Sequence, residues 1–151
     1  MSNNPQKFAA EFAKMLRVAG DKAELVVKKS ALSVLSAIEI KSPVGDPDSW
    51  ASPAPPGYTG GQFRANWNLS VESMDTDTTT DKDPSGEAAI KRAQGRIESY
   101  KLGDRIFITN SLPYAYRLEY EGWSRQAPQG MVRITALEFE QYVSQQAAKI
   151  R

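Results

Sequence analysis

The first forty residues carry apolar side chains at helical spacing, every three or four positions. In residues 5–19 the apolar positions are Phe8, Phe12, Met15, Leu16 and Ala19. Gly20 interrupts this pattern, and Asp21 opens a second one that begins like a capping box. The pattern therefore predicts two helices, one over residues 5–19 and one from Asp21 to about Lys41. Pro43 ends the second helix, because a proline disfavours helical geometry in the residue before it.

Two stretches lack any regular pattern. Residues 43–61 contain five of the nine prolines and four of the ten glycines, together with Trp50 and Tyr58. Neither a helix nor a strand can persist in such a stretch. A loop of this length in a compact domain is either a functional arm or a disordered insert. Residues 73–83 are polar and acidic, and they predict a second loop.

Strict alternation of apolar and polar residues predicts two strands. The first covers residues 66–71, where Trp67, Leu69 and Val71 share one face. The second covers residues 105–110. Each of these strands is expected to bury one face.

Three further helices are predicted after the first strand. Asp83 followed by proline is typical of a helix start, and apolar spacing carries that helix to about Tyr100. Residues 113–120 are aromatic-rich and predict a short helix, and residues 122–130 form a loop. A last stripe, from Val132 to Ile150, predicts a C-terminal helix. Together these elements predict one α+β domain over residues 1–151, in which a small, mostly antiparallel sheet packs with N-terminal and C-terminal helices.

Composition excludes several kinds of chemistry. The chain of 151 residues has no cysteine and no histidine. Zinc fingers, serine or cysteine nucleophiles activated by histidine, haem ligation by these residues and thiol redox pairs are therefore excluded within this chain. No signal peptide and no apolar run of about 20 residues is found, so we expect an intracellular protein without a membrane partner.

The acidic and glycine-rich stretches match no binding motif. Counted from Asp75, an EF-hand would need glycine where Thr80 stands and glutamate where Gly86 stands. The glycines form neither of the nucleotide-binding loops. No acid stands at a spacing that pairs it with a base. We therefore expect no cofactor, no metal site and no catalytic residue.

The charge balance argues against a dedicated DNA-wrapping protein. Nineteen basic and eighteen acidic residues give a net charge of +1, whereas such proteins carry a clear basic excess. Lys91, Arg92 and Arg96 lie on one predicted helix and are expected to form a solvated face. In a ring of many copies this face could instead line a lumen that contains DNA, where copy number multiplies a modest charge.

Aromatic residues are concentrated in and beside the loops. Trp50 and Trp123 stand in loops rich in glycine and proline, whereas Trp67 fits the core face of a strand. Tryptophan and tyrosine are enriched at protein interfaces, where rigid aromatic side chains carry much of the binding free energy. The two loop tryptophans are therefore predicted to lie at an interface.

Three stretches resemble one known family. They are Ser42-Pro43-Val44 with Gly61-Gln62-Phe63-Arg64-Ala65-Asn66-Trp67; Ile108-Thr109-Asn110-Ser111-Leu112-Pro113-Tyr114-Ala115; and Leu118-Glu119-Tyr120 with Gly122-Trp123-Ser124-Arg125-Gln126-Ala127-Pro128-Gln129-Gly130-Met131-Val132. In order and spacing they are similar to the tail-completion or neck proteins of long-tailed bacteriophages, which include the minor tail protein Z group. With the flanking helices, the resemblance covers nearly the whole chain. The departure is residues 45–60, where members of that family pass directly between the two ends of the loop.

The resemblance implies a structural role in the virion. Such proteins are subunits of a ring at the head–tail junction, where they complete the tail tube and join it to the head. A hexamer is expected from the symmetry of the tube, with neighbouring neck and tail-tube or tail-terminator proteins as partners. The protein would then be found in the virion and, during assembly, in the host cytoplasm.

Residues 43–63 and 120–131 are the segments expected to contact other subunits. Planar donors such as Arg64 and Arg125 suit carboxylates across an interface. The interface residues predicted in full are Trp50, Tyr58, Phe63, Arg64, Tyr114, Tyr120, Trp123, Arg125, Gln126 and Pro128.

Two functions from other classes remain open at the level of sequence. One is a small phage-encoded hydrolytic accessory protein that works through carboxylates. The other is a DNA-binding module that acts through Arg92 and Arg96. An enzyme would depend on one or two acidic side chains, and a DNA-binding module would lose affinity steeply with salt.

Overall fold

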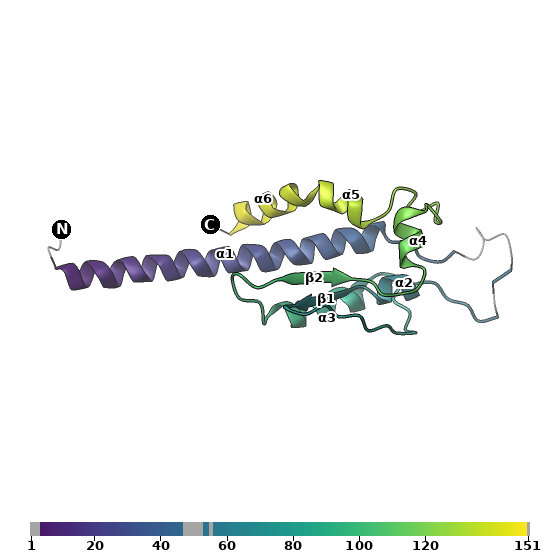
Figure 1. The fold of residues 1–151 in the computed structure, drawn as a ribbon, viewed down its shortest axis with the longest axis horizontal. Helices are drawn as coiled ribbons and strands as arrows, with labels where there is room; N and C mark the ends of the chain where they lie inside the picture. Colours follow the sequence, from purple (N-terminus) through teal and green to yellow (C-terminus); the bar gives the residue numbers. More distant parts are fainter. Residues whose placement is uncertain (1–3, 47–52, 55, 151) are drawn as a thin grey trace.

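The computed structural model describes residues 4–46, 53–54 and 56–150. Within them the chain forms six α-helices and a two-stranded antiparallel sheet (Figure 1). The elements are α1 (Pro5–Lys41), α2 (Gln62–Ala65), β1 (Asn68–Val71), α3 (Glu87–Ile97), β2 (Ile106–Thr109), α4 (Ala115–Tyr120), α5 (Val132–Leu137) and α6 (Phe139–Lys149). The predicted α+β class, with N-terminal and C-terminal helices around a small antiparallel sheet, is confirmed.

Helix α1 is the spine of the molecule. Asn4 caps its first turn, because the side-chain oxygen accepts hydrogen bonds from the backbone N–H groups of Gln6 and Lys7. The predicted break at Gly20 is wrong: the helix runs through this residue without interruption. A glycine inside a helix costs ~1 kcal/mol relative to alanine, and a side chain at Gly20 would meet only open space. The predicted end of the helix before Pro43 is confirmed.

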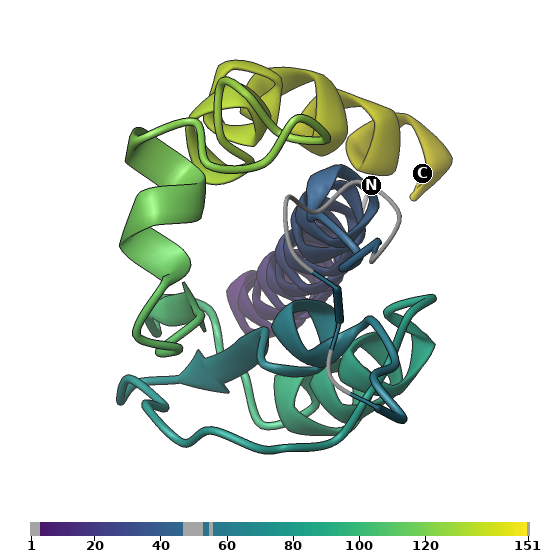
Figure 2. The same ribbon diagram turned by 90° about the vertical axis from the view of Figure 1, so that its right-hand side faces the viewer.

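The other elements surround the C-terminal half of α1. Figure 2, which looks along this helix, shows α5 and α6 on one side and the sheet with α3 on the other. In the sheet, Asn68 pairs with Thr109 and Val71 with Ile106. The core between these layers consists of Leu35, Ile38, Phe63, Trp67, Leu69, Ala93, Ile97, Tyr100, Leu112, Leu118, Ala127 and Met131.

Tertiary contacts change two of the predicted helices, and one short helix was not predicted. The helix expected from Asp83 begins only at Glu87, and the Asp83 carboxylate instead accepts a hydrogen bond from the N–H of Ala89 at 3.0 Å. The predicted C-terminal helix is divided at Glu138, whose carboxylate forms an ion pair with Lys41 at 2.9 Å. The short helix α2 was not predicted, because four residues are too few to show a helical repeat.

Glu39 is an acidic residue in the core. Only 1% of its surface is exposed, and neither carboxylate oxygen has a hydrogen-bond partner among the described residues. Gly86 lies against the carboxylate so closely that a side chain at this position would collide with it. Burial raises the pKa of Glu39 to about 8; the charge of Asp83 adds to this, and the charges of Arg64 and Arg92 oppose it.

Replacing this carboxyl group by an amide should make the protein more stable at alkaline pH. A carboxyl group with a raised folded-state pKa stabilises the fold fully below its ordinary value near 4.5, and this contribution is lost as the pH rises towards 8. Glu39→Gln should therefore match the wild type at pH 4.5 and exceed it at pH 8 by a few kcal/mol, since each pKa unit is worth ~1.4 kcal/mol. Urea unfolding at several pH values measures the difference.

Glu140→Gln is the matched control, because Glu140 is an exposed glutamate on α6. Its difference from the wild type should stay small at every pH. A Glu39→Gln difference that does not change between pH 4.5 and pH 8 would contradict this account of the buried carboxyl group.

Candidate interaction site

The end of α1 is the point where the two parts of the first resembling stretch meet. The hydroxyl of Ser42 donates to the carbonyl of Ile38 at 2.7 Å and accepts from the indole N–H of Trp67 at 2.8 Å. Trp67 is 4% exposed, so its predicted place in the core is confirmed. Both polar groups are buried, and each supplies the hydrogen bond that the other needs.

Arg64 strengthens the same junction. Its guanidinium donates to the carbonyl oxygens of Ser42 at 3.0 Å, Pro84 at 2.7 Å and Ile40 at 3.3 Å. These donors are therefore used within the chain, where the sequence suggested a carboxylate across an interface. Phe63 also lies inside the molecule, at 5% exposure, with its ring 5.6 Å from that of Trp67.

Asparagine side chains hold the loops around this junction. Asn66 is fully buried; its amide donates to the carbonyl of Thr79 at 2.9 Å and accepts from the N–H of Thr79 at 2.8 Å. Asn68 donates to the carbonyl of Asp77, and Asn110 donates to the carbonyl of Phe63 at 2.9 Å. Asn66 and Asn68 thus hold the polar loop 73–83 along the sheet through hydrogen bonds to the loop backbone.

Two predicted interface residues help to close the loop that follows α1. Gln126 exchanges two hydrogen bonds with the backbone of Val44, at 2.9 and 3.0 Å. Tyr58 is half-buried, and its hydroxyl lies where any side chain at Gly45 would have to be. Trp50 lies outside the described residues.

Tyr114 is half-buried between the core and the surface. Its ring centre lies 6.0 Å from that of Phe63. Burial raises the pKa of Tyr114, and the neighbouring Tyr58 adds to this shift. The phenol therefore stays neutral and serves packing.

Glu119 connects α4 with the start of α5. Its carboxylate accepts hydrogen bonds from the backbone N–H groups of Met131 at 2.7 Å, Val132 at 3.0 Å and Arg133 at 2.9 Å. Burial alone would raise the pKa of Glu119, but these donors and the Arg133 guanidinium outweigh burial and hold the pKa below its usual value. Gly130 has a φ of 86° and lies against Glu119, which leaves no room for a side chain.

An exposed cluster of aromatic rings and arginines covers the outer side of this connection. The Arg117 guanidinium lies 4.2 Å from the ring centre of Trp123, and that of Arg133 lies 4.8 Å from the ring centre of Tyr120. The rings of Tyr116 and Tyr120 are 4.8 Å apart. We call these five residues the arginine–aromatic patch; it lies on α4, the loop after it and the start of α5, at the end of the molecule opposite the N-terminus (Figure 1).

The aromatic rings of this patch are open to solvent. Tyr116, Tyr120 and Trp123 are 64%, 55% and 57% exposed. Stacked arginines hold the rings in place, and cation–π contacts of this kind contribute ~0.5–1 kcal/mol at exposed sites. Arg125 and Pro128 are exposed in the adjoining loop. The patch therefore offers the residue types that dominate protein interfaces, already ordered in the single chain.

The basic residues of α3 divide into two groups. Lys91 is exposed, as predicted. Arg92 and Arg96 are half-buried, so the prediction of a solvated face is wrong for them. Arg92 donates to the carbonyl oxygens of Ala65 and Trp67, both at 3.0 Å, and Arg96 forms an ion pair with Asp75 at 2.6 Å. Both side chains hold the polar segments beside the sheet.

The described part of the chain contains no group of three acidic side chains placed to hold a metal ion. None of its helices is long and apolar enough to cross a membrane. Comparison of the chain with models of known protein families, with curated proteins and with solved structures finds no match in any of the three.

Sequence reasoning missed Glu119 and three members of the patch, Tyr116, Arg117 and Arg133. The spacing of Tyr116 and Tyr120 puts both rings on one side of a helix and could have indicated their contact. Nothing in the sequence marks Glu119 as a helix cap, because its partners come 12–14 positions later.

Removing the charge of Glu119 should destabilise the connection between α4 and α5. Glu119→Gln loses hydrogen bonds to a charged acceptor and turns an amide N–H towards backbone donors, which should cost roughly 1.5–3 kcal/mol of unfolding free energy. The wild-type advantage should be present above the ordinary pKa near 4.5 and should be lost as the pH falls through the lowered folded-state pKa. Urea unfolding between pH 3 and pH 7 measures it.

Glu121→Gln serves as the control for this substitution. Glu121 is exposed and reaches Arg117 only at 4.0 Å, so its change should alter stability by less than ~0.5 kcal/mol. Equal effects of the two substitutions would show that the helix cap contributes nothing special.

Proposed function

We propose that this chain is a structural subunit of the head–tail junction of a long-tailed bacteriophage. In this role it forms a ring, with six copies expected from the symmetry of the tail tube, and it completes the tube and joins it to the head. It acts by binding to itself and to neighbouring neck and tail-tube or tail-terminator proteins. Its place is the virion and, before assembly, the host cytoplasm.

The arginine–aromatic patch is the observation that carries the proposal. Three aromatic rings are more than half exposed on one chain, and two arginines stack on them. Such side chains are costly to leave in water and are the commonest anchors of protein interfaces. A subunit that must join others through a preformed surface needs an arrangement of this kind.

The resembling stretches support the proposal in a second way. Residues 42–44, 61–67, 108–115 and 118–132 contact one another in the fold through Ser42, Trp67, Gln126 and Asn110. Segments that are distant in the sequence therefore pack together at one junction beside the patch. In the proposed ring this junction holds the patch at a fixed angle to α1. Of the basic residues of α3, Lys91 is the one free to face a DNA-containing lumen.

Removing the central ring of the patch should impair assembly and leave the subunit folded. Trp123→Ala removes an exposed indole. Among the described residues, the stacking of Arg117 is the one ring contact that this indole makes. Truncating one anchor residue of an interface costs about 2 kcal/mol of binding free energy, so the yield of joined, infectious particles should fall about 30-fold. A particle count, an infectivity assay and thermal unfolding of the purified variant measure the three effects.

Leu137→Ala is the matched control, because Leu137 is 85% exposed on α5 and lies outside the patch. Particles that contain Leu137→Ala should form normally. Electron cryomicroscopy of the neck should show density for this chain as a ring between head and tail tube. Normal particle yield with Trp123→Ala, or absence of the protein from intact particles, would overturn the proposal.

A further inference from the structure

The N-terminal half of α1 projects beyond the rest of the molecule and carries an uncovered apolar stripe (Figure 1). Phe8, Phe12, Met15 and Leu16 are 66%, 49%, 64% and 58% exposed. Together they leave roughly 400 Å² of apolar surface on one helix face, a size at which exposed patches indicate an interaction site. The stripe continues to Ala19, which is also exposed.

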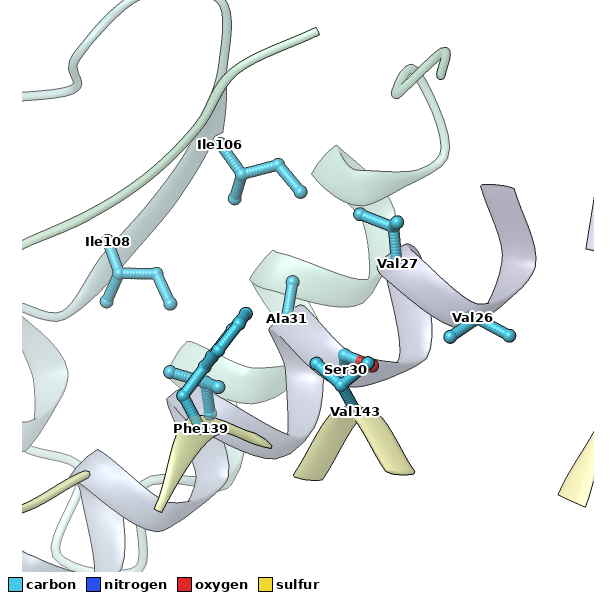
Figure 3. Close-up of a pocket in the computed structure, with 9 residues that line it drawn as sticks. Val26, Val27, Ser30, Ala31, Ile106, Ile108, Phe139 and Val143 are labelled. Carbon is cyan, nitrogen blue, oxygen red and sulfur yellow. The ribbon is translucent and has the colours of Figure 1, made fainter. Parts of the chain in front are cut away.

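An apolar furrow runs along the other half of the same helix. Its floor is α1, and its walls are Ile106 and Ile108 of β2 on one side and Phe139 and Val143 of α6 on the other (Figure 3). It has a volume of about 350 Å³, and Ser30 is its only polar lining residue. A second hollow shares Val34 and Phe139 with it and extends the furrow to Ile38.

Ser30, the polar residue of this lining, has a buried hydroxyl group without a hydrogen-bond partner among the described residues. Only 4% of its surface is exposed. Phe139 is 53% exposed although it forms a furrow wall. The open apolar furrow and the exposed ring of Phe139 are the part of this surface on which a second apolar surface can be buried.

The stripe cannot fill the furrow of its own chain. Both lie on α1, which is one uninterrupted helix from Pro5 to Lys41, so the stripe stays on the projecting half and cannot fold back onto the furrow. A second copy of the chain brings the same stripe from outside. The dimensions agree: the stripe from Phe8 to Ala19 and the furrow from Val26 to Ile38 each extend ~17 Å at ~1.5 Å per residue.

We infer that the free protein forms a two-fold dimer in which the stripe of each copy lies in the furrow of the other, with the two α1 helices antiparallel. At about 100° per residue, the mean directions of stripe and furrow floor differ by only ~50°, so both lie on nearly the same face of α1. Face-to-face packing then forms both contacts at once. Such a contact is isologous and closes after two copies.

The area agrees with a stable dimer. One stripe offers roughly 400 Å², which alone is half of the ~800 Å² per partner in a standard interface. In the reciprocal arrangement each copy buries its stripe and its furrow, and the two copies together pass the ~1,000 Å² of total area that a specific interface needs. If only one stripe lay in one furrow, the buried area would be too small for a stable dimer.

This inference goes beyond the proposed ring and uses different residues. The arginine–aromatic patch lies at the opposite end of the molecule from the stripe (Figure 1). The dimer is therefore a state of the free protein whose proposed contacts use none of the patch residues. Loss of the dimer and loss of particle assembly can be measured separately.

A single introduced cysteine tests the geometry. The midpoints of stripe and furrow place the two-fold axis beside residue 23, and Ala23 is small, exposed and on the same face of α1. Because the chain has no cysteine of its own, Ala23→Cys should give a disulfide-linked dimer in nearly full yield under mild oxidation. Asp21→Cys is the matched control: this exposed position lies on the opposite face of α1, and the variant should stay more than 80% unlinked.

Charge placed on the stripe tests its role in full-length protein. Phe12→Asp with Leu16→Asp should raise the dimer dissociation constant at least 100-fold in sedimentation experiments. Lys14→Asp with Arg17→Asp, at exposed positions beside the stripe, should change it less than fivefold. Circular dichroism confirms that each variant keeps its helix content.

Three outcomes would overturn the inference. A wild-type protein that is monomeric at 100 μM would show that the stripe does not bind the furrow of a second copy. Equal cross-linking of the two cysteine variants would show random collision. A dimer that survives both stripe aspartates would place the contact elsewhere. None of these results bears on Trp123→Ala, whose effect on particles tests the proposed ring independently.

Discussion

The contact between Ser42 and Trp67 is the point on which the rest of the structure depends. It lies at the end of the long helix α1, where the Ser42 hydroxyl bonds back to the last turn, and it attaches the buried indole of Trp67 to this helix. Arg64 then collects three carbonyl oxygens around the same point. A sheet of only two strands cannot stand alone in water. It is stable here because this junction holds it against α1.

Two buried carboxylates show how strongly local surroundings decide the role of an acidic residue. Glu119 accepts three backbone N–H groups at the start of α5, and the charged form is favoured in spite of burial. Glu39 has no such donors, and burial favours its neutral form. The first holds together the part of the chain that carries the arginine–aromatic patch. The second reduces stability at alkaline pH and lies far from that patch along the chain.

The exposed apolar surfaces lie at the two ends of an elongated molecule. One end carries aromatic rings stacked with arginines, and the other carries an aliphatic and aromatic helix stripe. The two differ in chemistry. The patch is amphipathic, because charged guanidinium groups lie on its aromatic rings. The stripe has no polar members and gains most from being covered at once.

Periodicity in the sequence determined the class of most elements. The alternation at Trp67, Leu69 and Val71 gave the strand, and apolar spacing every three or four residues gave the main helices, because these patterns express only which side of an element is buried. Tertiary contacts decided the rest. Gly20 lies inside the continuous helix α1, and α6 begins after Glu138, which is paired with Lys41. The patch and the furrow were also beyond the sequence. The patch unites residues of α4 and α5, the furrow unites residues of α1, β2 and α6, and only the packing of these elements brings the residues together.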